Sequence, residues 1–197
     1  MRNPETLNTL RRLLKKPFFT STEVKALGVN PSILSHYVNT HQLKRLRRGV
    51  YCAVNAPEIH SQWGDLIEAA KAIRGGVICL TSALAIYELT DEISRAHWIA
   101  VSNSTSANAK RPIKIIRMRN ISLGQTTINI DGVMVKIFNH ERTIVDAFRQ
   151  LSKETAIKAL KAALSAQYSH KLDLQKLQQY AKALHVNIAP YLLAVTT

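Results

Sequence analysis

Apolar residues near the start of the chain recur at the spacing of two amphipathic helices. The leucines of residues 7–14 repeat every three or four positions after Pro4, a residue that the first turn of a helix accepts. The sequence Thr-Ser-Thr-Glu at residues 20–23 matches a capping box, and Gly28 is a suitable stop for the short helix that would follow. The pattern therefore predicts a first helix and a shorter second one.

Asn30 and Pro31 predict the start of a third helix, with asparagine as its cap and proline in its first position. Its apolar face would be formed by Ile33, Leu34, Tyr37 and Val38. Its polar face would be formed by Ser32, Ser35, His36, Asn39 and Thr40. Two short helices joined by a glycine-containing turn are typical of a helix-turn-helix, whose second helix enters the DNA major groove. Hydroxyl, imidazole and amide groups can hydrogen-bond to base edges, although a merely solvated face is polar as well.

A basic segment follows and switches at once to an apolar run. Four cations surround a glycine turn: Lys44, Arg45, Arg47 and Arg48. Gly49 supplies the positive φ of a tight turn, and residues 50–54 alternate as a half-buried strand would. We therefore expect a β-hairpin that holds the cations in solvent, where they can bind phosphates and release counterions. A helix, a helix-turn-helix and a basic hairpin in this order predict a winged helix-turn-helix, with a solvated helical bundle as the alternative.

Beyond a linker at residues 55–57, the pattern predicts a mixed α/β domain. Helices are expected at residues 60–73, 81–89, 141–151, 153–167 and 173–184. Strands are expected at residues 77–80, 98–101, 113–118, 126–130 and 133–138, the last two joined by an Asp-Gly hairpin turn. The predicted fold class is therefore α/β (α+β), with a winged helix-turn-helix domain over residues 1–55 and a second domain over residues 56–197.

Charge favours the DNA-binding interpretation. The chain carries a net charge of +14, and residues 1–55 hold ten Lys or Arg against only Glu5 and Glu23. Such a charge indicates a nucleic acid or an anionic membrane surface as the partner. No apolar run approaches the roughly 18 residues of a spanning helix, and the first residues lack the apolar core of a signal peptide. We therefore expect a cytoplasmic protein that does not bind membranes.

The residues that catalysis would need do not occur in a useful arrangement. The only Glu-x-Lys is at residues 23–25, inside a helix of the DNA-binding domain, whereas a metal-dependent nuclease needs this motif beside a further carboxylate. There is no phosphate-binding Gly-rich loop, and His36 and His41 lack the cysteine pair of a zinc finger. Cys52 and Cys79 are expected to be small buried hydrophobic residues. We therefore expect no catalytic residues, metal or cofactor.

One histidine invites a catalytic interpretation. His140 lies near Glu141 and Asp146 in the sequence, but a satisfied polar start of a helix is the better explanation. Arg142 and Asp146 are four residues apart, so an ion pair within one helix is expected.

Three segments follow the pattern of a known family. Residues 43–51 read Leu-Lys-Arg-Leu-Arg-Arg-Gly-Val-Tyr, residues 77–84 are an apolar strand that leads through Thr81 into Ser-Ala-Leu, and residues 141–146 read Glu-Arg-Thr-Ile-Val-Asp. In these segments the chain resembles the AbiEi-type antitoxins, which are transcriptional regulators of type IV toxin–antitoxin loci.

The resemblance implies that the N-terminal domain binds inverted repeats in double-stranded promoter DNA and represses its own promoter. It also implies a C-terminal domain that opposes a nucleotidyltransferase-like toxin without a stable complex between the two proteins. On this hypothesis bases are read by Ser32, Ser35, His36 and Asn39. Phosphates or a minor groove are bound by Lys44, Arg45, Arg47 and Arg48. We expect a monomer or weak oligomer, with cooperative binding to DNA left open. The alternatives are a nuclease or an RNA-binding adaptor that carries the same N-terminal domain.

A second group of cations lies between Glu92 and Asp131, an interval without any acid. A secondary basic patch would be formed by Lys110, Arg111, Lys114, Arg117 and Arg119. The first two would stand at the base of a polar surface loop that begins at residue 102. The sequence leaves three explanations open: an extension of the DNA footprint, a solvated basic face, or a surface for the RNA on which a toxin acts.

Overall fold

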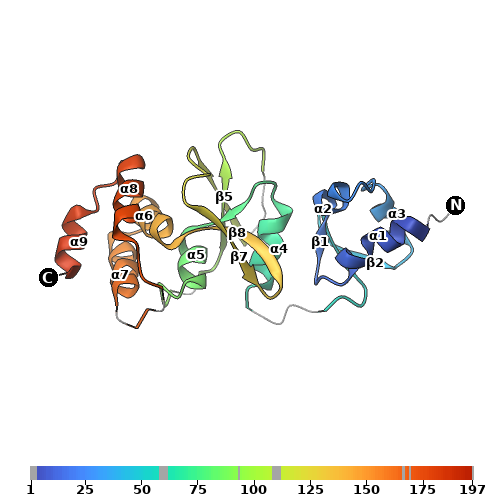
Figure 1. Ribbon diagram of the computed structural model, residues 1–197, viewed down its shortest axis with the longest axis horizontal. Helices are drawn as coiled ribbons and strands as arrows, with labels where there is room; N and C mark the ends of the chain where they lie inside the picture. The colour runs from blue at the N-terminus through green and yellow to red at the C-terminus, as the bar shows by residue number, and fades with distance from the viewer. Residues whose placement is uncertain are drawn as a thin grey trace. The chain divides into compact units, whose positions relative to one another are not determined.

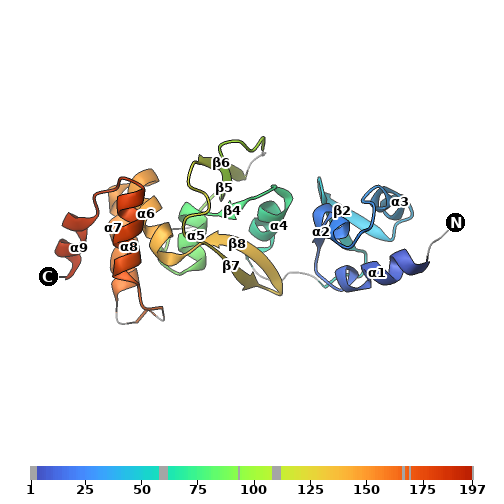
Figure 2. The same ribbon diagram turned by 45° about the horizontal axis from the view of Figure 1, so that its top comes forward.

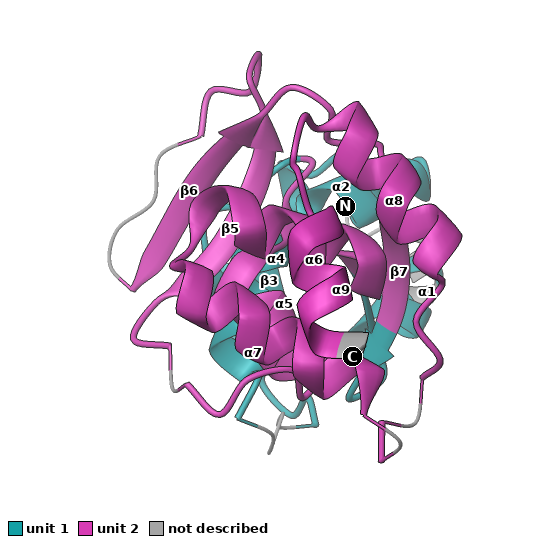
Figure 3. Ribbon diagram, turned by 90° about the vertical axis from the view of Figure 1, so that its left-hand side faces the viewer, with its two compact units in different colours: residues 1–74, 129–135 teal, residues 75–128, 136–197 magenta. Residues whose placement is uncertain are grey.

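The computed structural model describes residues 4–57, 62–92, 94–107, 112–165, 167–168 and 170–196. The chain has the predicted mixed α/β fold and forms two compact units. The first comprises Met1–Arg74 with Asn129–Val135, and the second comprises Gly75–Ile128 with Lys136–Thr197 (Figure 3). The functional division after residue 55 stays a prediction.

The first unit begins with helices and a small sheet. In chain order its elements are α1 (Pro4–Leu14), β1 (Phe19–Thr20), α2 (Ser21–Ala26), α3 (Ile33–Asn39), β2 (Leu43–Arg47), β3 (Val50–Ala53) and α4 (Gly64–Ala72) (Figure 1). The sheet is antiparallel with the order β1-β3-β2. Its apolar core includes Leu10, Phe19, Val24, Leu34 and Tyr51. Three helices packed on a sheet whose last two strands form a hairpin are the predicted winged helix-turn-helix.

Local hydrogen bonds explain how α2 and α3 begin. The predicted capping box is present, because Thr20 Oγ1 accepts from the Glu23 backbone N–H and the Thr20 backbone N–H donates to Glu23 Oε2 at 2.8 Å. The predicted start of α3 at Pro31 is two residues too early. Asn30 Oδ1 accepts from the Ser32 backbone N–H at 3.0 Å and caps a tighter turn first, so that the α-helix begins at Ile33.

The hairpin differs from its predicted pattern. Val50, Tyr51 and Cys52 are all buried, so the expected alternation along β3 is wrong. Tyr51 faces the helical core, where its ring stacks on Phe19 with centroids 6.3 Å apart. Cys52 lines a cavity of about 360 Å³ on the opposite face, together with residues of α4. Both faces of this central strand are therefore covered.

The second unit is built on a five-stranded sheet. Its strands are β4 (Val77–Ile78), β5 (His97–Ser102), β6 (Ile113–Met118), β7 (Gln125–Ile130) and β8 (Val133–Phe138), in the order β6-β5-β4-β8-β7. The tip of the β7–β8 hairpin groups with the first unit. β4 pairs antiparallel with β5 and parallel with β8, and β5 pairs parallel with β6. Asp131 and Gly132 have φ of 51° and 79°, the conformation of the predicted tight hairpin turn.

In the described part of the second unit the sheet is joined by the helices α5 (Leu80–Ile86), α6 (His140–Gln150), α7 (Lys153–Leu164), α8 (Leu174–Ala183) and α9 (Ala189–Thr196). Figure 2 shows α6, α7 and α8 side by side. Their shared core includes Leu84, Ile144, Phe148, Leu160 and Leu177. None of the helices in the described part of the chain is long and apolar enough to cross a membrane.

Several predicted boundaries in this unit and in α4 are wrong. α4 begins at Gly64 rather than at residue 60, and α7 ends at Leu164 rather than at 167. The strand predicted for residues 77–80 stops at Ile78, because Leu80 already opens α5. Thr81 therefore lies inside the helix, and its hydroxyl donates to Ser94 Oγ at 3.2 Å. Neither β1 nor α9 was predicted, and β1 is too short for its two residues to show a hydrophobic period.

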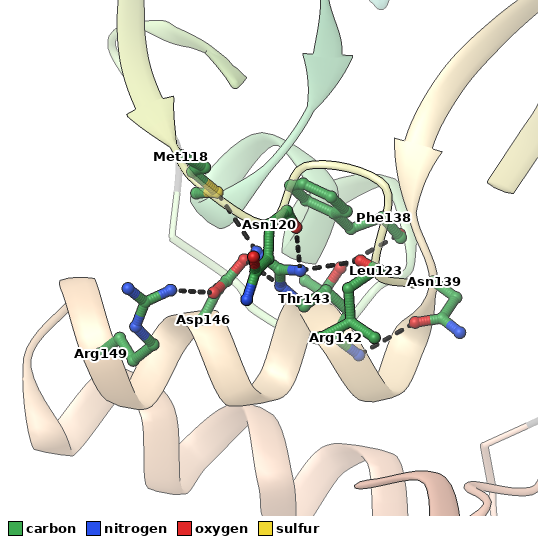
Figure 4. Close-up of polar contacts among 9 residues, drawn as sticks. All are labelled: Met118, Asn120, Leu123, Phe138, Asn139, Arg142, Thr143, Asp146 and Arg149. Atoms are coloured by element: carbon green, nitrogen blue, oxygen red, sulfur yellow. Dashed lines mark hydrogen bonds and ion pairs between the residues drawn. The ribbon is translucent and has the colours of Figure 1, made fainter. Parts of the chain in front are cut away.

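A buried ion pair anchors α6 to the sheet (Figure 4). Arg142 is completely buried, and its Nε donates to Asp146 Oδ2 at 2.8 Å, as the spacing predicted. Its Nη1 donates to the carbonyls of Asn120 and Leu123 at 2.9 and 2.8 Å, and its guanidinium lies over the ring of Phe138. These contacts give Arg142 and Asp146 a structural role.

Gly124 completes the surroundings of Arg142. A Cβ at this glycine would lie 2.6 Å from Arg142 Cβ, and its φ is +68°. Only glycine therefore fits here without strain.

Candidate nucleic-acid interface

The outward face of α3 presents the four side chains predicted to read bases. They are Ser32, Ser35, His36 and Asn39, and all four are exposed. Their spacing of three, four and seven residues places them on one side of the helix, while Leu34 and Tyr37 are buried on the other. No hydrogen bond engages these four side chains within the described residues, so their polar atoms are available to a ligand.

The hairpin of β2 and β3, called the wing, has four cations, and three of them are exposed. Lys44, Arg45 and Arg48 are exposed and have no acidic partner among the described residues. Arg47 is different, because its Nε lies 2.5 Å from Glu68 Oε1 on α4. The two side chains are 34% and 17% exposed. The expectation that all four cations are held out in solvent is therefore wrong for Arg47.

An irregularity in β2 turns Arg47 toward Glu68. Arg45 pairs with Tyr51, but Arg47 pairs with Val50, so that Leu46 is the extra residue of a β-bulge. Residues directly opposite one another in an antiparallel pair share a face of the sheet. Arg47 therefore lies on the same face of the sheet as Val50 and Cys52, which is the face next to α4. Tyr51 points to the opposite face. No local pattern in the sequence links Arg47 to an acid 21 residues away.

A second ion pair gives another cation of the N-terminal segment an acidic partner. Lys16 Nζ lies 2.9 Å from Glu23 Oε1. Burial raises the pKa of Glu23, but hydrogen bonds from Lys16 and Thr20 outweigh it and leave the pKa below its ordinary value. The exposed cations of this segment without an acidic partner among the described residues then include Arg11, Arg12, Lys15, Lys44, Arg45 and Arg48.

The secondary basic patch is only partly described. Lys110 and Arg111 lie outside the described residues. Lys114, Arg117 and Arg119 are exposed along and just after β6, an edge strand of the sheet. Lys114 Nζ lies 4.6 Å from the centre of the Trp98 ring, and Arg117 donates to the carbonyl of Ala107 at 3.4 Å. Lys114 and Arg117 are three residues apart on a strand and so point to opposite faces.

His140 and Asp146 do not form an acid–base pair. The His140 ring is stacked between Tyr87 and His170, with centroids 3.8 and 3.9 Å away, while Asp146 binds Arg142 and Arg149. Burial, and then the neighbouring His170, lower the pKa of His140 to about 4. The ring is therefore neutral near pH 7.

Neither the cysteines nor the other potential metal ligands among the described residues form a metal site. Cys52 and Cys79 are free and buried, as expected. Among the described residues, no three His, Cys, Asp or Glu side chains are grouped so that they could hold a metal ion.

Comparison with known families agrees with the geometry of the first unit. Residues 7–54 match the family model described as "Transcriptional regulator, AbiEi antitoxin". The chain matches no curated protein. The matched residues run from within α1 to just beyond β3 and contain both the exposed face of α3 and the wing. Over the residues of this winged helix-turn-helix, about a quarter of the chain, the protein is similar to the AbiEi antitoxin family of transcriptional regulators.

Proposed function

We propose that the protein is a DNA-binding autorepressor and the antitoxin of a type IV toxin–antitoxin locus. One observation carries the proposal: the family match coincides with a winged helix-turn-helix whose exposed helix face and wing have unengaged polar and cationic groups. Residues 1–55 would bind inverted repeats in the promoter. Residues 56–197 would oppose a nucleotidyltransferase-like toxin in the cytoplasm without a stable complex and without enzymatic activity.

The two halves of the interface have different tasks. The side chains proposed to read base edges are Ser32, Ser35, His36 and Asn39. The wing cations Lys44, Arg45 and Arg48 bind phosphates and so set the affinity for DNA and the register on it. Arg47 is paired with Glu68 and can bind a phosphate only when this ion pair breaks.

Substitutions in the wing and in α3 test this division. Arg48→Ala should weaken binding to promoter and unrelated duplexes alike and lower the slope of log K against log salt by about one unit. Asn39→Ala should weaken binding to the promoter alone, by about 1–3 kcal/mol. Fluorescence anisotropy with labelled duplexes measures both. The matched control is Lys161→Ala on α7, which removes an exposed cation from the second unit.

The outcomes separate the proposal from its rivals. If Arg48→Ala changes binding no more than Lys161→Ala does, the wing does not bind phosphates. Cleavage of DNA or RNA that depends on an added divalent metal would establish a nuclease instead. RNA that displaces the promoter duplex would establish an RNA-binding adaptor.

A further inference from the structure

A cavity in the second unit is lined by cations and by no acid. It has a volume of about 560 Å³ and lies where the end of α6, the start of α7 and the connection from α8 into α9 meet. Its polar lining is formed by Arg149, Gln150, Lys153, His185, Asn187 and Tyr191. Cavities of about 300–1,000 Å³ with a few converging polar groups are the usual size for small ligands.

Lys153 is fixed at this cavity by uncharged groups. Its Nζ donates to the carbonyl of Phe148 at 3.1 Å and lies 5.5 Å from the ring centres of both Phe148 and Tyr191. No acid neutralises it among the described residues, and two of its three N–H donors are left for a ligand. The ammonium group is thus held in position with its charge uncompensated.

The ammonium group of Lys153 is held where two helix ends meet. Lys153 is the first residue of α7, directly after the Ser152 cap, where the helix dipole disfavours cations. Its Nζ contacts the carbonyl of Phe148 in the last turn of α6, where the helix dipole favours cations. The end of α6 therefore fixes this cation at the cavity, and no carboxylate among the described residues takes up its charge.

Arg149 adds a second oriented cation. Its Nη1 contacts Asp146 Oδ1 at 3.2 Å, but the same carboxylate also accepts from Arg142 at 2.8 Å. One negative charge therefore serves two guanidinium groups, and the triad keeps a net positive charge. Arg149 remains 32% exposed, with most of its N–H donors unused among the described residues.

We propose that this cavity binds the phosphate groups of a small phosphorylated ligand of nucleotide size, with Arg149 and Lys153 as the anion-binding residues. The guanidinium of Arg149 and the ammonium of Lys153 can each donate to a phosphate oxygen, and such charge-assisted hydrogen bonds are stronger than those between neutral groups. The amides of Gln150 and Asn187 and the ring of Tyr191 provide contacts for the uncharged part of the ligand. The site is independent of the DNA-binding function proposed for the first unit.

Isothermal titration calorimetry on the full chain tests the proposal with three probes: pyrophosphate, ATP and adenosine. Pyrophosphate and ATP should bind, and adenosine should not. Lys153→Gln should weaken the binding of both phosphates by about tenfold or more, whereas Lys161→Gln, an exposed position further along α7, should leave it unchanged. His185→Gln provides a second test at the cavity without altering the ion pairs of α6, and it should also weaken the binding of pyrophosphate and ATP.

Several results would overturn the proposal. If adenosine binds as well as ATP, the phosphates are not what the cavity recognises. If neither pyrophosphate nor ATP gives a heat of binding at millimolar concentration, the cavity does not bind phosphates. Equal losses in Lys153→Gln and Lys161→Gln would mean attraction to net charge alone. A short single-stranded oligonucleotide that binds far more tightly than ATP, in a manner abolished by Lys153→Gln, would assign the site to a nucleic-acid backbone and not to a small ligand.

Discussion

Replacing Glu68 by glutamine should strengthen DNA binding, because it releases Arg47 from the acid that neutralises it. Arg47 Nε lies 2.5 Å from Glu68 Oε1, but it is not aligned as a hydrogen-bond donor to that oxygen. The two side chains are 34% and 17% exposed, so the pair is partly solvated and its contribution should be close to that of surface ion pairs, about 0.2–1 kcal/mol. The cost of breaking the pair when DNA binds is therefore small but measurable.

The size of the effect follows from two terms. Removing the competing carboxylate and freeing one phosphate contact should together improve the binding free energy by about 1 kcal/mol, or about fivefold in Kd. One more phosphate contact should also steepen the slope of log K against log salt by about 0.9. Anisotropy titrations of a promoter duplex at several salt concentrations give both quantities for wild type and Glu68→Gln.

Two further variants decide whether the effect passes through Arg47. Asp65→Asn removes an exposed acid from α4, and Asp65 lines the same cavity beside Cys52 that Glu68 lines. If it strengthens binding as much as Glu68→Gln does, only net charge matters. In the double variant with Arg47→Gln, the gain from Glu68→Gln should disappear. Weaker binding by Glu68→Gln alone would refute the reasoning, since it would mean that Glu68 orients Arg47 toward DNA.

Two other predictions concern the second unit. Arg142→Met removes the main partner of a fully buried carboxylate, and it should lower the free energy of unfolding by about 3–5 kcal/mol in urea denaturation; a loss below about 1 kcal/mol would mean that the network is dispensable. The pKa of His140 falls from an ordinary 6.5 to about 4 on folding, so its neutral ring stabilises the fold fully above pH 6.5 and this contribution is lost as the pH falls toward 4. The midpoint of thermal unfolding should therefore decline over this interval, and decline less in His140→Phe; parallel curves for the two proteins would contradict this.

Elements with strong local signals were predictable from the sequence. The bounds of β6 and β8 are those predicted, and the capping box at Thr20 marks the start of α2. These features depend on residues within a few positions of one another. The apolar α9 was missed because its residues lack the one-sided period that reveals a helix packed on one face.

Features that depend on tertiary contacts could not be predicted in the same way. The exposed face of α3 was visible as a set of polar positions, but the pairing of Arg47 with Glu68 arises only when α4 lies beside the wing within the first unit. Burial of Cys52 has the same origin, since the residues of α4 cover the second face of β3. The cationic cavity likewise joins Arg149 and Lys153 to residues more than thirty positions away.

The bulge at Leu46 makes the pairing register of β2 as important as its composition. A relative or designed variant of the same length but with regular pairing would place Leu46 opposite Val50, and Arg47 would then lie on the face of Tyr51 and not on the α4 side. A shift in register of a single residue would thus adjust the strength and salt sensitivity of promoter binding while the charge of the domain stays constant. Alignments that count basic residues in this hairpin would not detect such a change.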